Sequence, residues 1–304
     1  MARSRKAFTL LELIVALFVI GLLTALLLPS VQSSWEASRR LHCASHLRQL
    51  GIALHNYEGQ FGCFPAGHGL ISLHVRLLPW LDQATLLNQH DPWAEGGDEN
   101  PVPGLNGLSK HQIPVFRCPA ESFGRTSTVN YVGNFGTGFW DTQQLRQTDG
   151  FFSARCWRAP DISDGLSNTV AMSEILVGNG TPDRRRNLWK TPYSMTAPGQ
   201  REVFAHFCRE TAHQGNGAGN YWKGNNWTIG SVPDTLYDHV LFPNDVSCLN
   251  GNLALPAAYS AASQHPGGVQ SLLGDGHVRF ISTSVDLTVW RALGSRNGHE
   301  VISF

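Results

Sequence analysis

One long apolar run, from Phe8 to Leu28, constrains this sequence more than any other feature. It reads FTLLELIVALFVIGLLTALLL and contains a single charged residue, Glu12. At a helical rise of about 1.5 Å per residue, the run matches a bilayer's hydrocarbon core of about 30 Å. A secretory signal peptide has a shorter apolar region that ends at a small-residue cleavage site. Residues 24–29, TALLLP, offer no such site, so we predict a membrane-spanning anchor.

The residues before the anchor predict its orientation. Arg3, Arg5 and Lys6 lie in a basic leader, residues 1–7. Because basic residues favour the cytoplasmic side of a membrane, we expect a single-pass protein of the cytoplasmic membrane with its N-terminus inside. The remaining chain is then periplasmic or extracellular. The formal net charge of the whole sequence is zero, which gives no reason to expect nucleic acid as a partner.

Glu12 is the unusual residue of the anchor. A carboxylate inside an apolar helix costs a few kcal/mol on insertion scales, so it usually marks a functional contact. The alternative is a carboxylate close enough to the helix end to reach the lipid headgroups. The residues around Glu12 bear on this choice.

A basic leader, the sequence Phe8-Thr9-Leu10-Leu11-Glu12 and an apolar helix that meets Pro29 closely resemble the type IV prepilin signature. The resemblance implies that a prepilin peptidase cuts between Ala7 and Phe8 and that the new amino group is methylated. It also implies that Glu12 pairs with the N-terminus of a neighbouring pilin-like subunit during assembly. Prepilins usually carry Gly before the cut, whereas this chain has Ala7, whose methyl group is expected to slow processing.

Residues 29–59 predict an amphipathic continuation of the anchor helix, ending near Gly59. Apolar or small residues recur there at steps of three and four: Ala37, Leu41, Ala44, Leu47, Gly51 and Leu54. Pro29 lacks a backbone N–H and is expected to bend the helix. The first half would lie in lipid and the second half against a globular domain, which is the lollipop plan of pilins.

Residues 60–304 predict a globular, pilin-like ectodomain of the α+β class, rich in antiparallel strands. A helical segment is expected over Leu73–Leu87 and a capped helix over Asp286–Leu293. Strands are expected over Ile113–Ala120, Thr126–Phe135, Asn168–Glu174, Val269–Leu273 and His277–Ile281, the last two joined by the turn Gly274-Asp275-Gly276. Regular periodicity is lost from about residue 178 to 258, which we interpret as a variable insert. Within it, the Gly- and Asn-rich stretch His213–Trp227 is expected to form a long surface segment.

Several segments carry a second, more specific resemblance. They read RRLHCASHLRQLGIALHNYEGQFGCFPAG, VRLLPWLDQ, VFRCPAE, DISDGLSNTVAMSE and HPGGVQSLLGDGHVRFIS. They resemble a pilin-like bacterial family of unknown function whose C-terminal signature is His, nine residues, then Asp-Gly. In this chain the signature is His265 with Asp275 and Gly276, and only residues 178–258 lie outside the resemblance. It implies a pilin-like, membrane-anchored surface or secretory protein and no particular reaction.

His265 and Asp275 suggest a metal or acid–base pair, but the expected hairpin argues against it. A strand of about 3.3 Å per residue would hold the two residues roughly 15–25 Å apart. We therefore expect separate roles, in which Asp275 and Gly276 form a turn with positive φ and His265 lies at the strand entry.

Asp161 and Asp164 lie in the sequence DISDG, which resembles part of a calcium loop. The twelve-residue pattern with its terminal bidentate Glu is missing, and a turn is the favoured interpretation. Calcium is the one cofactor that these residues suggest, and no other is expected.

Trp222 and Trp227, beside several Asn residues, suggest a second kind of protein. Flat aromatic rings with amide donors suit carbohydrate faces, so the alternative function is a permanently anchored ectodomain that binds a glycan. A third class, an enzyme with an unrecognised site, has no support from nucleophile motifs. We expect a non-enzymatic protein.

All six cysteines follow the anchor, so we expect disulfides on the exported side. Cys43 lies on the helix continuation, and Cys118 follows the apolar residues Val115 and Phe116. A Cys43–Cys118 bridge would fix the ectodomain to its helix and is the favoured pair, with Cys63 as the competing partner for Cys43.

Overall fold

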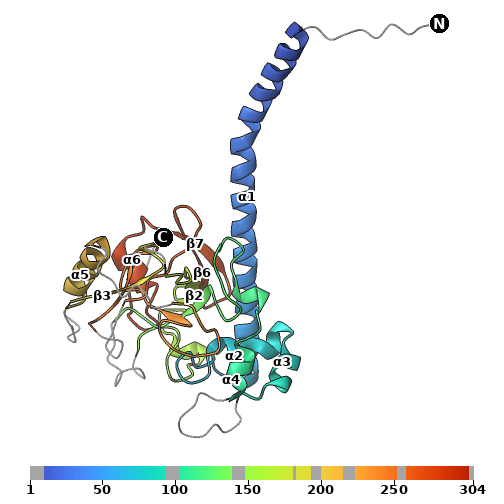
Figure 1. Ribbon diagram of the computed structural model, residues 1–304. Coiled ribbons are helices and arrows are strands. Elements are labelled where there is room, and N and C mark those ends of the chain that lie inside the picture. Colours follow the sequence, from blue (N-terminus) through green and yellow to red (C-terminus); the bar gives the residue numbers. More distant parts are fainter. Residues whose placement is uncertain are drawn as a thin grey trace.

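Helix α1, Leu10–Phe61, organises the molecule: its N-terminal part projects away from the body, and its C-terminal part lies against it (Figure 1). This computed structural model describes residues 10–92, 103–138, 148–180, 183–192, 200–214, 223–251 and 258–300. The basic leader with Ala7 and Phe8 lies outside them. A long helix carrying a mixed, sheet-rich body confirms the predicted α+β lollipop.

The α1 helix continues without a break through Pro29. Figure 1 shows the N-terminal, dark blue part of α1 inclined to the rest, as expected where a proline removes a backbone donor. Only part of the predicted amphipathic face is buried. Ala44, Leu47, Gly51 and Leu54 are buried, whereas Leu41 is 67% exposed. The prediction for Ala37 and Leu41 was wrong because the ectodomain contacts only one side of α1 there, at Glu36 and Arg40, and full burial of the helix begins at Cys43.

The main sheet has five strands in the order β4-β1-β2-β6-β7. Their bounds are β1 Tyr131–Asn134, β2 Val170–Glu174, β4 Leu236–Tyr237, β6 Gly268–Leu273 and β7 Val278–Ser282. Every neighbouring pair is antiparallel except β1 and β4, which run parallel. All residues of β1, β2 and β6 are buried, so this sheet forms the centre of the larger core.

The β6–β7 hairpin packs on α1, and its Asp275-Gly276 turn lies beside that helix. Gly276 has φ of 90°, a conformation that glycine adopts at little cost. On the helix, a Cβ added to Gly51 would lie 3.0 Å from Leu272 and 3.4 Å from the Cα of Gly276. Two glycines therefore let the helix and the hairpin approach closely.

The other helices of the described residues are much shorter than α1. They are α2 (Leu73–Leu77), η1 (Leu78–Leu81), α3 (Ala84–Gln89), α4 (Pro103–Leu108), η2 (Pro114–Phe116), η4 (Ala159–Asp161), α5 (Arg201–Gln214) and α6 (Leu287–Ala292). Of these, α2, η1 and η2 pack on α1, as the β6–β7 hairpin does. Asp286 caps α6 as predicted, accepting from the backbone N–H of Thr288. The strand predicted over Ile113–Ala120 was wrong. Pro114 has no N–H to give a sheet and starts the 3₁₀ turn η2 instead.

The described residues between 178 and 258 belong to the folded body, so the insert predicted from loss of periodicity was wrong for them. They supply β4 to the main sheet and form a small parallel pair, β3 (Leu188–Lys190) with β5 (Ser247–Leu249). Helix α5 packs on this pair around a second apolar cluster, and Cys208 of α5 is bonded to Cys248 of β5. No strand signal was present in the sequence here because strands of two or three residues are too short to show hydrophobic alternation.

Candidate functional site

The N-terminal half of α1 is the first candidate site. Among the described residues, one helix is long and apolar enough to cross a membrane, and no residue of its most apolar window is buried inside the protein. Glu12 lies in the first turn of this helix with its side chain exposed. The arrangement therefore presents a carboxylate and a continuous apolar surface to whatever surrounds the helix.

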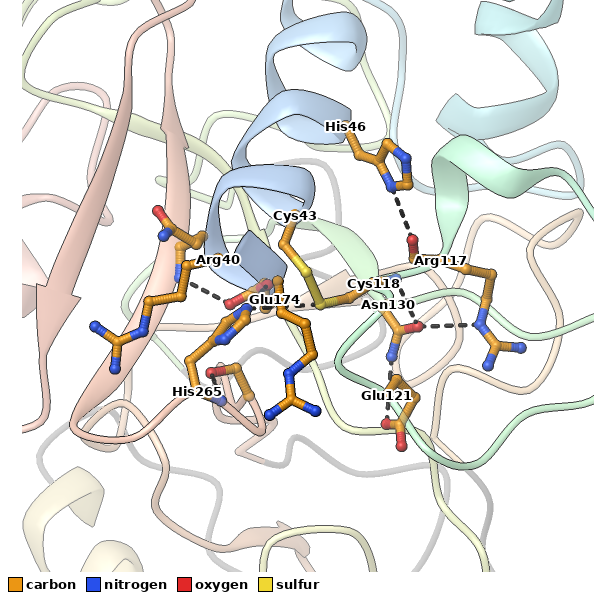
Figure 2. Close-up of a disulfide and its surroundings, with 12 residues drawn as sticks. Arg40, Cys43, His46, Arg117, Cys118, Glu121, Asn130, Glu174 and His265 are labelled. Atoms are coloured by element: carbon orange, nitrogen blue, oxygen red, sulfur yellow. Dashed lines mark hydrogen bonds and ion pairs between the residues drawn. A yellow bond between two sulfur atoms is a disulfide. The ribbon is translucent and has the colours of Figure 1, made fainter. Parts of the chain in front are cut away.

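The second candidate site is the junction where α1 enters the ectodomain (Figure 2). Cys43 of α1 is bonded to Cys118, which follows η2, and their Cα atoms lie 5.1 Å apart. The structure thus joins the pair that the sequence favoured, and it leaves Cys63 as a free thiol. Cys43 is fully buried and Cys118 is 6% exposed. The bond fixes the helix to the body from inside.

His265 lies against this disulfide and between two carboxylates. Its Nδ1 is 2.8 Å from Oε1 of Glu36 on α1, and its Nε2 is 3.5 Å from Oε1 of Glu174 on β2. The same Nε2 lies 3.7 Å from Sγ of Cys118. Since the imidazole is buried and Glu174 is only 1% exposed, the cluster is an internal ionic contact between helix and sheet.

The charges around His265 favour its protonated form. Burial is the largest influence and by itself lowers the pKa of His265, but Glu174 and Glu36 together outweigh it and raise that pKa above 6.5. For Glu36, burial raises the pKa, while His265, Arg40 and Arg39 outweigh it and hold that pKa below 4.5. Both His265 and Glu36 are therefore charged, and the ion pair is formed, between about pH 4.5 and pH 6.5.

Backbone contacts extend the junction on both sides. Arg40 donates to the carbonyl of Pro266, next to His265, and its guanidinium lies 4.5 Å from the ring centre of Phe280 on β7. Oε2 of Glu174 accepts from the backbone N–H of Gln270, at 2.8 Å. Arg40 and Glu174 therefore also hold neighbouring segments in place.

Beyond the disulfide, Asn130 ties Cys118 to the interior. Its Oδ1 accepts from the backbone N–H of Cys118 and from Nε of Arg117 (Figure 2). Its Nδ2 donates to Glu121, whose carboxylate is 2.7 Å from the guanidinium of Arg186. Both members of that last pair are almost fully buried. A charged, hydrogen-bonded network therefore surrounds the disulfide, as buried charges require.

Four side chains of kinds that ligate metals meet here: Cys43, Cys118, Glu174 and His265 have ligand atoms within 4.8 Å of one another. A metal would need the cysteines as thiolates. In the structure the two sulfur atoms are bonded to each other, so one imidazole nitrogen and one carboxylate oxygen remain. That donor set does not fit a structural zinc site, which uses four ligands.

His265 and Asp275 lie at opposite ends of β6, as the hairpin predicted. Asp275 contacts His277, accepting from its backbone N–H at 3.0 Å. The six residues of β6 separate the two signature positions by about 20 Å at 3.3 Å per residue. Asp275 and Gly276 therefore form the turn beside α1, while His265 belongs to the buried ionic cluster, a role that the sequence did not reveal.

Asp161 and Asp164 are occupied by protein donors. Asp161 binds the guanidinium of Arg158 at 3.0 Å. Asp164 accepts from the hydroxyl of Ser295 and from the backbone N–H groups of Gly298 and His299. These carboxylates hold η4 and the C-terminal segment, and their arrangement gives no support to the calcium hypothesis.

Trp227 is not available to stack on a sugar. Its side chain is fully buried, with Nε1 donating to the carbonyl of His111 and its ring 5.4 Å from that of Phe116. The prediction of a ligand-binding Trp227 was wrong, because its neighbourhood belongs to the core. Trp222 lies outside the described residues.

The apolar helix and its covalently fixed junction define a class, a pilin-like protein with an anchor helix and a sheet-rich body. Comparison with known families agrees. Residues 2–28 match the prokaryotic N-terminal methylation motif, and residues 32–288 match a family described as a protein of unknown function, DUF1559. The chain belongs to that family. The match includes residues 178–258, so the prediction that they lie outside the family resemblance was wrong.

No curated protein and no solved structure matches this chain. The roles of the two candidate sites therefore follow from the residues of this chain alone. Sequence reasoning missed Glu36 and Glu174 as partners of His265. One signal was present, because Glu36 and Arg40 lie four residues apart on one helix face, where opposite charges pair. Nothing in the sequence showed that His265 would join them.

Proposed function

We propose that this protein is a non-enzymatic pilin or pseudopilin-like subunit that assembles through α1. One observation carries the proposal: the N-terminal half of α1 exposes apolar side chains on all sides and carries Glu12 one turn from the methylation motif's cut site. A carboxylate there is costly in lipid. A methylated N-terminal ammonium of a neighbouring subunit would compensate it in a low dielectric.

The junction supports a structural role for the ectodomain. The cluster of Cys43, Cys118, Glu174 and His265 is buried. Its two sulfur atoms are bonded to each other, and its imidazole is paired with Glu36 and Glu174. A subunit that is packed or pulled in an assembly needs its body fixed to its helix. We place the N-terminus in the cytoplasm and the body outside the cytoplasmic membrane, with the prepilin peptidase as the processing partner.

Mass spectrometry of the N-terminus of protein isolated from membranes tests processing. We expect a chain that begins with methylated Phe8, and Ala7→Gly should raise its fraction by removing a methyl group from the cleavage site. Recovery of only intact Met1 or Ala2 termini would contradict cleavage while leaving the anchor in place.

Crosslinking in membranes tests assembly. Glu12→Gln keeps the side chain's size but removes its charge, so crosslinked oligomers should fall while membrane insertion is kept or improved. Thr24→Val is the matched control, because it changes a polar residue of the same helix whose hydroxyl donates to the carbonyls of Ile20 and Gly21 in that helix. Oligomers that persist unchanged in Glu12→Gln would refute the role of Glu12.

A further inference from the structure

Two cysteines outside the two disulfides lie close to each other. Cys63 follows the end of α1, and Cys156 precedes Trp157, whose carbonyl accepts from the backbone N–H of Phe64 at 2.8 Å. Phe64 and Trp157 form an antiparallel bridge. In such a bridge the residues preceding each partner point to the same face as diagonal neighbours. The backbone therefore directs Cys63 and Cys156 to one side of the bridge.

The two thiols also affect each other electrostatically. Burial, then the proximity of the Cys156 thiol and the charge of Glu58, raise the pKa of Cys63 to about 11. The backbone bridge and this proximity together place the two thiols beside each other, and a disulfide requires two cysteines that face each other in this way.

We propose that Cys63 and Cys156 form a third disulfide, which ties the end of α1 to the segment that leads into η4 and β2. The proposal rests on the proposed export of the ectodomain, because disulfides persist in oxidising compartments outside the cytoplasm. It would pair all six cysteines of the chain.

The chemistry is a thiol–disulfide exchange with an external disulfide, such as a thiol oxidoreductase or oxidised glutathione. The Cys156 sulfur attacks the oxidant and forms a mixed disulfide, and one oxidant thiol leaves. The Cys63 sulfur then attacks Cys156, the second oxidant thiol leaves, and the proton of Cys63 passes to it. The two cysteines lose two electrons and two protons, which reduce the oxidant to two thiols.

This bond would differ from the other two in access. Cys43, Cys208 and Cys248 are fully buried, whereas Cys156 is exposed and Cys63 half-buried. An external thiol therefore reaches the third disulfide first. The disulfide at the end of α1 could then be reduced and re-formed, while the buried Cys43–Cys118 disulfide stays oxidised.

The test uses the full chain, purified in detergent, treated with oxidised glutathione and mapped by non-reducing mass spectrometry. We expect a Cys63–Cys156 crosslinked peptide, no alkylatable thiol, and closure that is faster at higher pH because Cys63 must lose its proton. The unfolding midpoint should rise by roughly 10 °C on closure, given a loop of about 90 residues. Mild dithiothreitol should then open this bond at least about tenfold faster than the other two, since only its sulfurs are accessible.

Two alkylatable thiols that remain at Cys63 and Cys156 after oxidised glutathione would overturn the proposal, as would a crosslink of either to another cysteine. Cys63→Ser is the control, and it should trap glutathione on Cys156. The two proposals can fail separately. If Cys63 and Cys156 form a disulfide in the purified protein but are free thiols in protein taken directly from membranes, the disulfide is supported and export of the ectodomain is not.

Discussion

The two halves of α1 share one helical backbone but face opposite surroundings. Large apolar residues between Leu10 and Leu28 are 46–76% exposed. Between Cys43 and Leu54, by contrast, seven residues of the same helix are buried against the ectodomain. The first half is apolar around its whole circumference, which suits lipid, and the second has one apolar face, which suits a protein core.

The comparison shows that hydrophobic content alone does not place a segment inside a protein. Leu22 and Leu50 have the same side chain on the same helix, yet Leu22 is 53% exposed and Leu50 is fully buried. What differs is the presence of the ectodomain, which the disulfide and the His265 cluster hold against the second half. The predictions below test that difference, from the largest expected effect to the smallest.

Loss of the junction disulfide should have the largest effect. Replacing both Cys43 and Cys118 with Ala should lower the free energy of unfolding by about 4.5 kcal/mol, because the bridge closes a loop of 75 residues. Urea unfolding in detergent, followed by tryptophan fluorescence, measures it. Limited proteolysis then compares the two disulfides. Loss of Cys43–Cys118 should make α1 more sensitive to protease, whereas the control Cys208→Ala/Cys248→Ala should leave α1 as resistant as in the wild type. Equal protease sensitivity of α1 in both variants would contradict the role assigned to the junction.

Truncating a buried leucine should separate the two halves directly. Leu50→Ala should destabilise the ectodomain by about 3.5 kcal/mol, since it leaves a cavity in the core. Leu22→Ala removes the same atoms from the projecting half and should leave the urea midpoint unchanged. Similar shifts for both variants would mean that the projecting half is packed in the folded protein.

His265→Gln removes the charge of His265 and should lower the free energy of unfolding by about 3 kcal/mol near pH 5.5, because Glu174 is left buried without a counter-charge. The raised pKa of His265 contributes stability below pH 6.5, and this is lost as pH rises through the higher folded value. The lowered pKa of Glu36 contributes above pH 4.5, and this is lost as pH falls through the lower folded value.

The difference in unfolding free energy between wild type and His265→Gln should therefore be largest from about pH 4.5 to 6.5 and shrink on the alkaline side. Thermal melts across pH measure it. His277→Gln is the matched control, because that ring is 80% exposed at the far end of β6. A difference that grows above pH 7 would contradict the ion pair.

The smallest effect concerns the turn beside α1. Gly276→Ala should cost about 1.5 kcal/mol, because a side chain at φ of 90° is strained although there is space for it. Gly59→Ala, in the regular part of α1 with nothing near its Cβ, should instead be neutral or stabilising by up to about 1 kcal/mol. The urea denaturation midpoints of Gly276→Ala and Gly59→Ala, each compared with that of the wild type, measure the two effects. A neutral Gly276→Ala would show that the turn relaxes.

Local signals predicted the parts of this protein that local physics decides. The anchor, the β6–β7 hairpin and the Asp286 cap each depend on residues a few positions apart. The segment from 178 to 258 could not be interpreted in this way, because β3 and β5 pair across about 60 residues and are three residues long. At the junction, Cys43 and Cys118 could be paired in advance, but Glu36, Glu174 and His265 come from three distant segments.

The sequence by itself determined that an apolar helix leads the chain, that Glu12 lies within it and that Asp275-Gly276 makes a turn. Only the tertiary structure decided that His265 bridges Glu36 and Glu174, that Trp227 belongs to the core and that Leu41 stays exposed. The physical reason is that periodicity and turn chemistry act within a few residues. Burial and charge pairing depend instead on which distant segments the folded chain brings together.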